Sequence, residues 1–462
     1  MTDHLTALDA AFLELEEGNP STHMHIGWTM VFDPLPGDAT PSVDELRRLL
    51  DERLTLLPRF RRRLSSPDTG PLSWPTWEDE EEFDVAEQVG EASVPEPGGG
   101  EELLGWMARF YSQRLDRTRP LWEMVVLDGL EGGRWAIAAK VHHCLVDGVS
   151  GASVTTLLLD AEAHPDPEST GLLEGFEPPP DREEGIFGPL SLITHGVRAG
   201  VELALHPSKL RDALSRSRDV AELLVRDELR GAPRTSLNVR IGRDRRLAEL
   251  SVPLDEVKAI KRELGGTVND VVLAGCAGGL RTLLESRSEE PDPHGVRAMV
   301  PVSVREASEA VALGNRVSSL FVELPVAEPE PRERHRLTIE ATNALKESGQ
   351  AAGAAAVLDV AALAPPVLHA AVARLSYTPR LFNITITNVP GPQTTLYALG
   401  APLRHIFPLV PIFSHHAVGI AIVSYDGEVV FGLNADRDAV PDLEVLKDGI
   451  ADSLAELRRL AA

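Results

Sequence analysis

Residues 135–148 of the chain read WAIAAKVHHCLVDG, a strand-like run that leads into two adjacent histidines and a turn. Side chains alternate between the two faces of a strand, so the odd-numbered residues up to His143 share one face and the even-numbered residues up to His142 share the other. The odd-numbered face is the more apolar one, and desolvation there favours a neutral imidazole. The two histidines are therefore expected to point to different sides, with His143 on the apolar side.

This placement suits His143 to acid–base chemistry. An imidazole with an ordinary pKa of about 6.5 can remove a hydroxyl proton at neutral pH. Ester formation from an alcohol and an activated acyl group requires that single proton transfer and needs neither a metal nor an organic cofactor. Three other interpretations fit the same residues: a satisfied core histidine beside a surface one, a metal site of His142, His143 and Asp147, and a nucleophile at Cys144. The strand position of Cys144 directs its thiol away from His143, which favours a buried free thiol.

The composition restricts the class of protein. The chain has 462 residues, of which 43% are hydrophobic and 25% charged, the balance of a globular enzyme with two domains or more. A formal net charge of −26 argues against a nucleic-acid-binding protein, because phosphate neutralisation needs a basic surface. Two cysteines without a CxxC pair exclude a disulfide framework and fit a reducing compartment. Neither a signal peptide nor an uninterrupted membrane-spanning run is predicted.

Composition divides the chain into three parts. A first globular part covers residues 1–163, and a second covers residues 247–462. Between them, residues 164–246 are predicted to form a linker that is acidic and proline-rich at first and then apolar and basic. In the first part, helices are predicted at 42–56, 101–115 and 150–160, and strands at 122–127 and 135–141.

The second part mixes helices and strands in the same way. A helix predicted at 255–264 ends at Gly265-Gly266, and Thr267 is expected to cap the next helix, which reaches about residue 285. The clearest local signal is a β-hairpin around the turn Asp426-Gly427. The remaining predicted elements are hairpin strands at 418–425 and 428–433, further strands at 297–302, 318–324 and 382–387, and an amphipathic helix over 443–457. The pattern predicts an α/β or α+β protein of two domains.

The run HHxxxDG at residues 142–148 resembles the signature of the CoA-dependent acyltransferase superfamily, which includes chloramphenicol acetyltransferases and nonribosomal peptide condensation domains. The resemblance implies that His143 is the catalytic base and that His142 supports it. It implies that Asp147, before Gly148, pairs with an arginine to hold the loop. It also implies two domains of chloramphenicol acetyltransferase-like topology with a substrate tunnel at their interface.

Within that superfamily the chain is most similar to the bacterial wax ester synthase/diacylglycerol acyltransferase family, over nearly its whole length. The matching blocks are LDAAFL at 8–13 with Glu16, MHIG at 24–27, PLW at 120–122, NDVVLA at 269–274, PVSVR at 301–305, LGN at 313–315, TNVPGP at 387–392 and ADRDAVPD at 435–442. HHxxxDG alone is moderately specific, whereas all of these blocks in the right order are a strong likeness.

Four residues of these blocks are expected on the substrate side of the site: Asn269, Asp270, Trp122 and Glu16. Asn269 either steadies the oxyanion of the reaction or caps the helix that starts there. Trp122 either contacts substrate or packs and positions the next strand. Glu16 either lines the alcohol side of the site or lies on a solvated helix face. Residues 388–392 are expected to form a turn that shapes the domain interface.

The resemblance predicts an acyl-CoA-dependent O-acyltransferase that esterifies diacylglycerol, long-chain alcohols or both, with acyl-CoA as substrate and no cofactor or metal. The alternatives are a carrier-protein-dependent condensation-type or polyketide-associated acyltransferase, and a catalytically silent lipid-binding protein on the same fold. Because such acceptors reside in membranes, we expect a cytoplasmic protein bound peripherally to the inner face of the membrane or to lipid inclusions. Candidate contacts are the apolar residues 186–205 and 351–373 and the basic residues 209–246.

Overall fold

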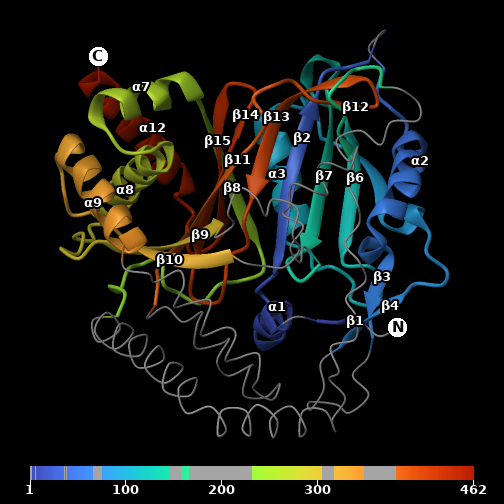
Figure 1. The fold of residues 1–462 in the computed structure, drawn as a ribbon, viewed down its shortest axis with the longest axis horizontal. Coiled ribbons are helices and arrows are strands. Elements are labelled where there is room, and N and C mark those ends of the chain that lie inside the picture. The colour runs from blue at the N-terminus through green and yellow to red at the C-terminus, as the bar shows by residue number, and fades with distance from the viewer. Residues whose placement is uncertain are drawn as a thin grey trace, which may run out of the picture.

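The structure, a computed structural model, consists of two halves whose sheets stand side by side (Figure 1). Each half has a six-stranded sheet with helices against it, so the predicted mixed α/β architecture of two domains is confirmed. A smaller sheet joins β1 (Asp3–His4), β4 (Thr76–Asp79) and β3 (Arg62–Leu64). The residues that the structure describes are 3–5, 7–35, 37, 39–65, 75–145, 158–165, 231–303, 317–347 and 381–461.

The first sheet has the strand order β12-β13-β2-β7-β6-β5. Its strands are β12 (Tyr397–Ala398), β13 (Ala401–Leu409), β2 (His25–Phe32), β7 (Trp135–His142), β6 (Trp122–Asp128) and β5 (Val89–Ser93). Only the β5–β6 pair among these neighbours is parallel. The predicted alternation along β7 is confirmed, because Trp135 and Ile137 lie in one core while Ala136 and Ala138 lie in another.

Helices cover both faces of this sheet. α2 (Val43–Arg53) begins at a capping box of Ser42 and Glu45, and its buried leucines share the core of the Trp135 face. α3 (Gly100–Tyr111) covers the opposite face. The helices predicted at 42–56 and 101–115 are thus confirmed, although α3 ends at Tyr111. The described part of this half also has short 3₁₀ turns: η1 (Leu54–Leu56), η2 (Pro58–Arg61), η4 (Val85–Glu87) and η5 (Glu131–Gly133).

The second sheet has the strand order β10-β9-β11-β14-β15-β8. Its strands are β10 (Val317–Leu324), β9 (Val296–Ser303), β11 (Ile384–Pro390), β14 (Val418–Tyr425), β15 (Glu428–Asp436) and β8 (Arg245–Pro253). The predicted hairpin is confirmed as β14 and β15, and both turn residues, Asp426 and Gly427, have positive φ. The strand predicted at 382–387 is found two residues later, as β11.

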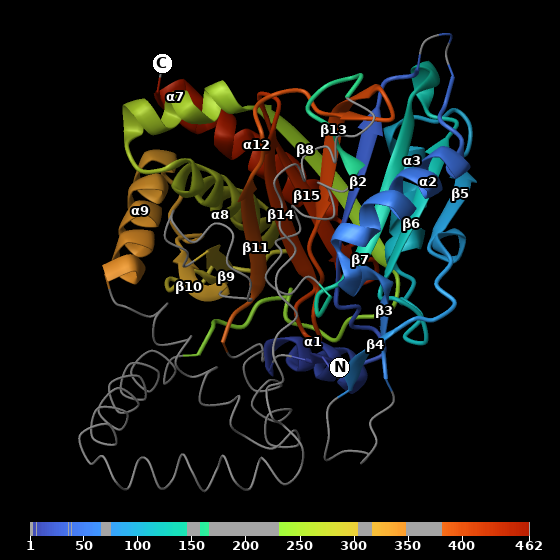
Figure 2. The ribbon, with the colours of Figure 1, turned by 45° about the vertical axis from the view of Figure 1, so that its right-hand side comes forward.

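Four of the described helices gather on one side of the second sheet (Figure 2). They are α7 (Leu254–Leu264), α8 (Val268–Ser286), α9 (Pro331–Glu347) and α12 (Leu443–Leu460). α8 is buried along most of its length, and glycines allow α12 to lie close to it. A Cβ atom on Gly279 would meet Ile450, and one on Gly278 would meet Ser453. The helices predicted at 255–264, from Thr267 and over 443–457 are confirmed.

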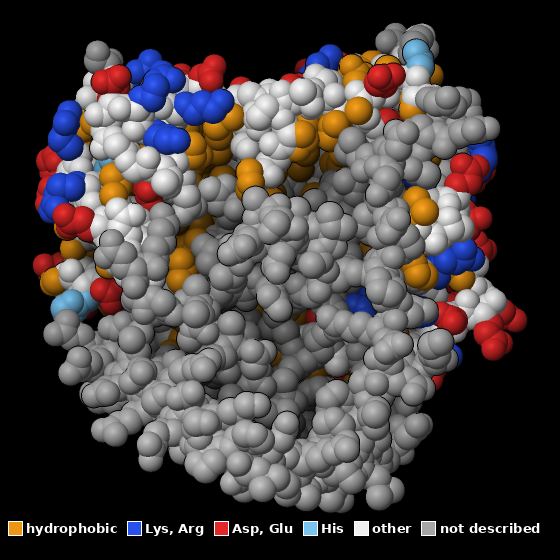
Figure 3. Space-filling view, in the orientation of Figure 1, with side chains coloured by type: hydrophobic (Ala, Val, Ile, Leu, Met, Phe, Trp, Pro, Cys, Tyr) orange, Lys and Arg blue, Asp and Glu red, His pale blue; other side chains and the backbone are white. Residues whose placement is uncertain are grey.

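Two elements join the halves through contacts between segments that are far apart in the sequence. β13 lies between β11 and β14 of the second half in sequence, yet it pairs with β2 as a strand of the first sheet. α3 of the first half contacts β8 of the second, and the backbone N–H of Arg245 donates to Ser112 Oγ at 3.0 Å. Hydrophobic side chains show between the two halves along the upper edge in Figure 3, while charged side chains lie over the outer flanks.

Several predictions concern residues outside the described part of the chain. They are the helix at 150–160 except for its end, most of the linker at 164–246, and the segments 186–205 and 351–373. The boundaries at 163 and 246 and the interface tunnel also stay predictions. Among the described helices, none is long and apolar enough to cross a membrane.

Candidate active site

Backbone hydrogen bonds to neighbouring segments fix the two histidines at the end of β7. His142 forms a register pair with His25 of β2, and the His142 N–H donates to Leu121 O at 2.9 Å. One residue later, the His143 N–H donates to Met24 O at 2.7 Å. Residues of the predicted MHIG and PLW blocks therefore fix the strand end from both sides. β7 ends at His142 and a turn begins at His143, so the opposite directions expected from strand alternation stay a prediction, while the two imidazoles have different neighbours.

The ring of His143 lies against an aromatic side chain of α1 (Ala7–Gly18). Its centroid is 3.9 Å from that of Phe12, with an interplanar angle of 27°. Burial lowers the pKa of His143 to about 4, while a hydrogen bond to its own backbone acts in the opposite direction. Within the described residues, its Nδ1 has no partner in another side chain or peptide group. His143 is therefore neutral at pH 7 and able to accept a proton.

Phe12 also shows where His143 lies in the molecule. It belongs to a buried cluster with Met24 of the first half and with Met299, Phe382 and Phe413 of the second. α1 lies below the strands of both sheets in Figure 1, which agrees with this mixed cluster. His143 is thus located where the two halves meet.

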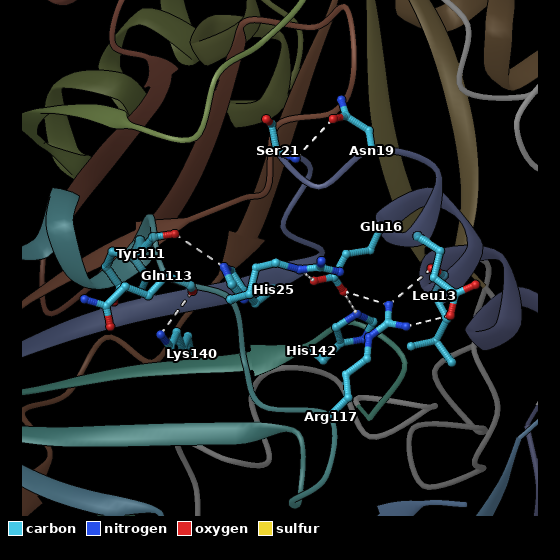
Figure 4. A network of polar contacts seen from close by, with 12 residues as sticks. Leu13, Glu16, Asn19, Ser21, His25, Tyr111, Gln113, Arg117, Lys140 and His142 are labelled. Atoms are coloured by element: carbon cyan, nitrogen blue, oxygen red, sulfur yellow. Dashed lines mark hydrogen bonds and ion pairs between the residues drawn. The ribbon is translucent and has the colours of Figure 1, made fainter. Parts of the chain in front are cut away.

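His142 takes part in a separate polar network, drawn in Figure 4. Its Nε2 lies 2.7 Å from Glu16 Oε2. Glu16 also accepts from Arg114 Nε at 2.8 Å and pairs with Arg117 at 3.3 Å. Burial would raise the pKa of Glu16, but the hydrogen bonds from His142 and Arg114 and the charge of Arg117 hold that pKa well below its usual range.

The interpretation of Glu16 as a solvated helix-face residue is therefore wrong. Glu16 is only 2% exposed, because α1 turns this side chain toward the sheet, where two partly exposed arginines pair with it. Its expected substrate contact stays a prediction. The contact between residues 16 and 142 spans 126 positions of sequence, and no local pattern indicates such a pair.

A buried lysine extends the polar face of the sheet beyond His142. The Lys140 Nζ donates to the carbonyl oxygens of Phe110 and Gln113 at 3.2 Å each and pairs with Glu123 at 2.9 Å. Tyr111 crosses from α3 to donate to Ala139 O at 3.3 Å. This face therefore carries structural hydrogen bonds, whereas the Phe12 side carries His143.

Cys144 is buried, as predicted for a free thiol. Its Sγ lies 2.9 Å from His142 Nδ1, and burial raises the pKa of the thiol well above its ordinary value. The protonated thiol is a poor nucleophile, which argues against catalysis by Cys144.

The ND block lies at the start of α8, where Thr267 is the cap. Thr267 Oγ1 accepts from the Asp270 N–H, and the Asp270 carboxylate accepts from the Thr267 N–H at 2.7 Å. Thr342 donates to the second oxygen of Asp270 at 2.7 Å. The interpretation of Asn269 as the helix cap is therefore wrong, since Thr267 already fills that position. Substrate contacts of Asn269 and Asp270 stay predictions, and both oxygens of Asp270 have partners in the fold.

Asn269 is held by another of the quoted blocks. Its Oδ1 accepts from Asn388 Nδ2 at 3.2 Å. Asn388 lies in strand β11, so residues 388–390 continue a strand instead of forming the expected turn. The contact leaves the Nδ2 group of Asn269 as a donor, which is the group that an oxyanion would need.

Trp122 is buried and donates from Nε1 to Phe60 O at 2.7 Å. This supports its packing role, and its substrate contact stays a prediction. Asp147 and Gly148 lie outside the described residues, so their roles stay predictions as well. Phe12, Arg114 and Arg117 were not singled out from the sequence. Phe12 is part of the quoted LDAAFL block and lies four residues before Glu16, which was the available signal for the first.

Comparison with known proteins shows the family of the chain. Residues 5–272 match the family model of the wax ester synthase/diacylglycerol acyltransferase catalytic domain, and residues 313–458 match that of the C-terminal domain of the same family. The chain belongs to the wax ester synthase/diacylglycerol acyltransferase family. A probable diacylglycerol O-acyltransferase of Mycobacterium tuberculosis is 34% identical over 98% of both chains. A second one from that organism is 32% identical over 98% of this chain and 96% of its own.

Solved structures extend the comparison to the fold. A wax ester synthase/diacylglycerol acyltransferase from Marinobacter aquaeolei VT8 has a TM-score of 0.69 at 28% identity, with 99% of each chain covered. The first condensation domain of the calcium-dependent antibiotic synthetase has a TM-score of 0.63 at 18% identity, covering 99% of this chain and 96% of its own. The second likeness shows the shared fold alone. The first supports placing the chain among the acyltransferases of the wax ester synthase/diacylglycerol acyltransferase family.

Proposed function

We propose that this acyltransferase moves a long acyl chain from acyl-CoA to the hydroxyl of diacylglycerol or of a long-chain alcohol, with His143 as the general base. The observation that carries the proposal is the neutral His143 ring, stacked on Phe12 at the junction of the two halves. The names of the relatives support the reaction class, since they are diacylglycerol O-acyltransferases.

In the proposed reaction, His143 takes the hydroxyl proton as the alcohol oxygen attacks the thioester carbonyl. The tetrahedral intermediate carries its negative charge on the former carbonyl oxygen, where the Asn269 amide is the proposed donor. Collapse breaks the carbon–sulfur bond, and the leaving thiolate of CoA recovers the proton from His143. The products are the ester and free CoA. The proposed reaction uses no covalent acyl-enzyme, metal or organic cofactor. Asp147 is proposed to hold the loop beyond Cys144.

The lipid acceptors also call for access to a lipid phase. We therefore propose peripheral association with the inner face of the membrane or with lipid inclusions. Co-sedimentation with vesicles of phosphatidylcholine containing diacylglycerol tests this part. Protein that stays in the supernatant with such vesicles, yet esterifies diacylglycerol in detergent, would contradict it.

The reaction is tested with purified protein, labelled palmitoyl-CoA and either diacylglycerol or hexadecanol. Wild-type protein is expected to yield labelled triacylglycerol or wax ester, and His143→Ala is expected to lose about 100-fold or more of the rate. His294→Ala is the matched control, since His294 is exposed and its side chain is outside the site. Ester formation from an acyl carrier protein only would favour the condensation-type alternative. Binding without turnover, by folded protein, would favour a silent lipid-binding protein.

A further inference from the structure

One helix face supports both histidines of the site. Phe12 and Glu16 lie one turn apart on α1, and side chains at this spacing lie on the same side of a helix. Phe12 stacks on His143, and Glu16 contacts the ring of His142 at 2.7 Å. The helix therefore reaches both sides of the strand end that carries the proposed base.

The contacts of His142 fix which of its nitrogens carries hydrogen. An ionised carboxylate only accepts hydrogen bonds, so the His142 Nε2 facing Glu16 must be protonated. The backbone N–H of Cys144 donates to His142 Nδ1 at 3.2 Å, so Nδ1 must be unprotonated. The contacts thus place the ring hydrogen of His142 on Nε2 and make Nδ1 an acceptor. The ring joins a carboxylate of α1 to the peptide group that follows His143.

The His142 ring adds one more hydrogen bond to those that fix the backbone around His143. The N–H of His142 donates to Leu121 O, the N–H of His143 to Met24 O, and the N–H of Leu145 to His142 O at 2.9 Å. The Cys144 N–H is bound by a side chain instead, and that side chain depends on Glu16. We propose that Glu16, acting through His142, is a positioning residue for proton transfer at His143. The inference rests on the proposed function of His143.

The surroundings of Glu16 fit a positioning role. Arg117 contacts α1 three times, through Glu16 at 3.3 Å, Glu17 at 2.7 Å and the carbonyl of Leu13 at 3.3 Å. Arg114 adds its bond to Glu16 at 2.8 Å. Buried ion pairs contribute little net stability, because removing charges from water offsets their attraction. What the network does provide is a fixed place for the carboxylate opposite the His142 ring.

Removing the Glu16 carboxylate changes which groups donate and which accept hydrogen bonds around His142. The His142 ring loses the acceptor that keeps its hydrogen on Nε2. With hydrogen on Nδ1 instead, two donors face each other at Cys144, and the backbone that carries His143 must move. Small displacements of a catalytic base lower the rate of the chemical step. We expect kcat to fall about tenfold or more in Glu16→Ala, with KM for palmitoyl-CoA changed by less than about twofold.

The experiment compares Glu16→Ala and Glu16→Gln with the matched control Glu17→Gln. Glu17 is the next residue of the same helix, pairs with the same Arg117, is 59% exposed and makes no contact with His142. Glu16→Gln keeps the size and one acceptor oxygen, so its kcat is expected between those of the wild type and Glu16→Ala. Glu17→Gln is expected to keep wild-type kcat.

A second readout does not depend on activity. Nitrogen-15 NMR of histidine-labelled protein distinguishes the two imidazole tautomers, and the His142 signals are those missing from His142→Gln. The expected wild-type spectrum has a protonated Nε2 and an unprotonated Nδ1, and Glu16→Ala should gain the other tautomer. If Glu16→Ala proves unfolded by thermal melting, Glu16→Gln carries the same comparison.

Three results would overturn the proposal. They are a protonated Nδ1 at His142 in the wild type, a kcat of folded Glu16→Ala within twofold of the wild type, and an equal loss in Glu17→Gln. Failure of the proposed function has a different signature. In that case wild-type protein makes no ester, or His143→Ala remains active, while the tautomer of His142 is still measured.

Discussion

Partial burial against Phe12 lowers the pKa of His143 to about 4. A base with this pKa stays neutral well below pH 6.5, so the acid limb of the pH–rate profile should lie near pH 4. We expect kcat/KM at pH 5.5 to stay within about twofold of its value at pH 7.5. A histidine of ordinary pKa would retain only about a tenth of its neutral form at pH 5.5. Rates measured after return to pH 7.5 control for inactivation.

Cys144 gives a second test at the scale of one side chain. Burial keeps its thiol protonated, so the native protein should resist iodoacetamide. Cys144→Ala retains the backbone N–H that donates to His142, and we expect it to keep activity within a few-fold of wild type. Mass spectrometry of the treated protein gives the extent of alkylation. Rapid alkylation coupled to inactivation, or an acyl group found on Cys144, would support the nucleophile interpretation instead.

What the sequence could predict for these residues depended on distance along the chain. The strand that leads to the two histidines was predictable, since it is one short run of sequence. The partner of His142 could not be predicted in this way. Glu16 is 126 residues away, and its burial depends on Arg114 and Arg117, which lie in a different loop. The solvated-face interpretation failed because helix spacing alone does not say which face meets a sheet.

At the scale of elements, the start of α8 allows the ND block to be tested as structure. Thr267 and Asp270 satisfy each other's backbone N–H groups. We expect Thr267→Ala to lower the free energy of unfolding by about 1 kcal/mol, while Thr267→Ser, which keeps the hydroxyl, should be nearly neutral. Urea denaturation measures both. No difference between the two variants would argue that the cap contributes nothing to stability.

The same contrast between local and distant contacts holds for elements. The hairpin at Asp426-Gly427 was predictable because two residues set its turn geometry. Helix caps at Ser42 and Thr267 are similarly local. The pairing of β13 with β2 was not predictable, since it joins residues about 375 positions apart through a strand that could have stayed in the second sheet. Pattern shows that a segment is a strand, whereas its neighbour is decided by the packing of the whole chain.

At the scale of the molecule, the pairing of β13 with β2 predicts that the two halves do not fold separately. Residues 1–246 alone lack β12 and β13, so the edge of β2 is left unpaired, and α3 loses most of β8. We expect this fragment to be insoluble or to unfold without a cooperative transition. The whole chain is expected to show one calorimetric transition. A soluble 1–246 fragment with a sharp melting transition would show that the first half is independent.

Buried histidines also make the stability of the whole molecule depend on pH. Burial lowers the pKa values of His23, His143 and His416 to about 4, from 6.5 when unfolded. Between these values the unfolded chain binds more protons than the folded one, so stability is full above pH 6.5 and is lost as pH falls toward 4. The net charge also shrinks toward the pI of about 5.0, which relieves repulsion and acts in the opposite direction.

Comparison of the wild type with His416→Gln separates these two effects. His416 is fully buried between the carbonyl oxygens of Ser414 and Phe382, and the change in overall charge is common to both proteins. The variant lacks one of the histidines whose pKa is lowered, so its stability should depend less on pH. We expect the wild type to lose about 1 kcal/mol more than the variant between pH 7.5 and pH 5.5, by urea denaturation at low protein concentration. Parallel curves would mean that His416 keeps an ordinary pKa in the folded protein, with its charged form stabilised by the two carbonyl groups.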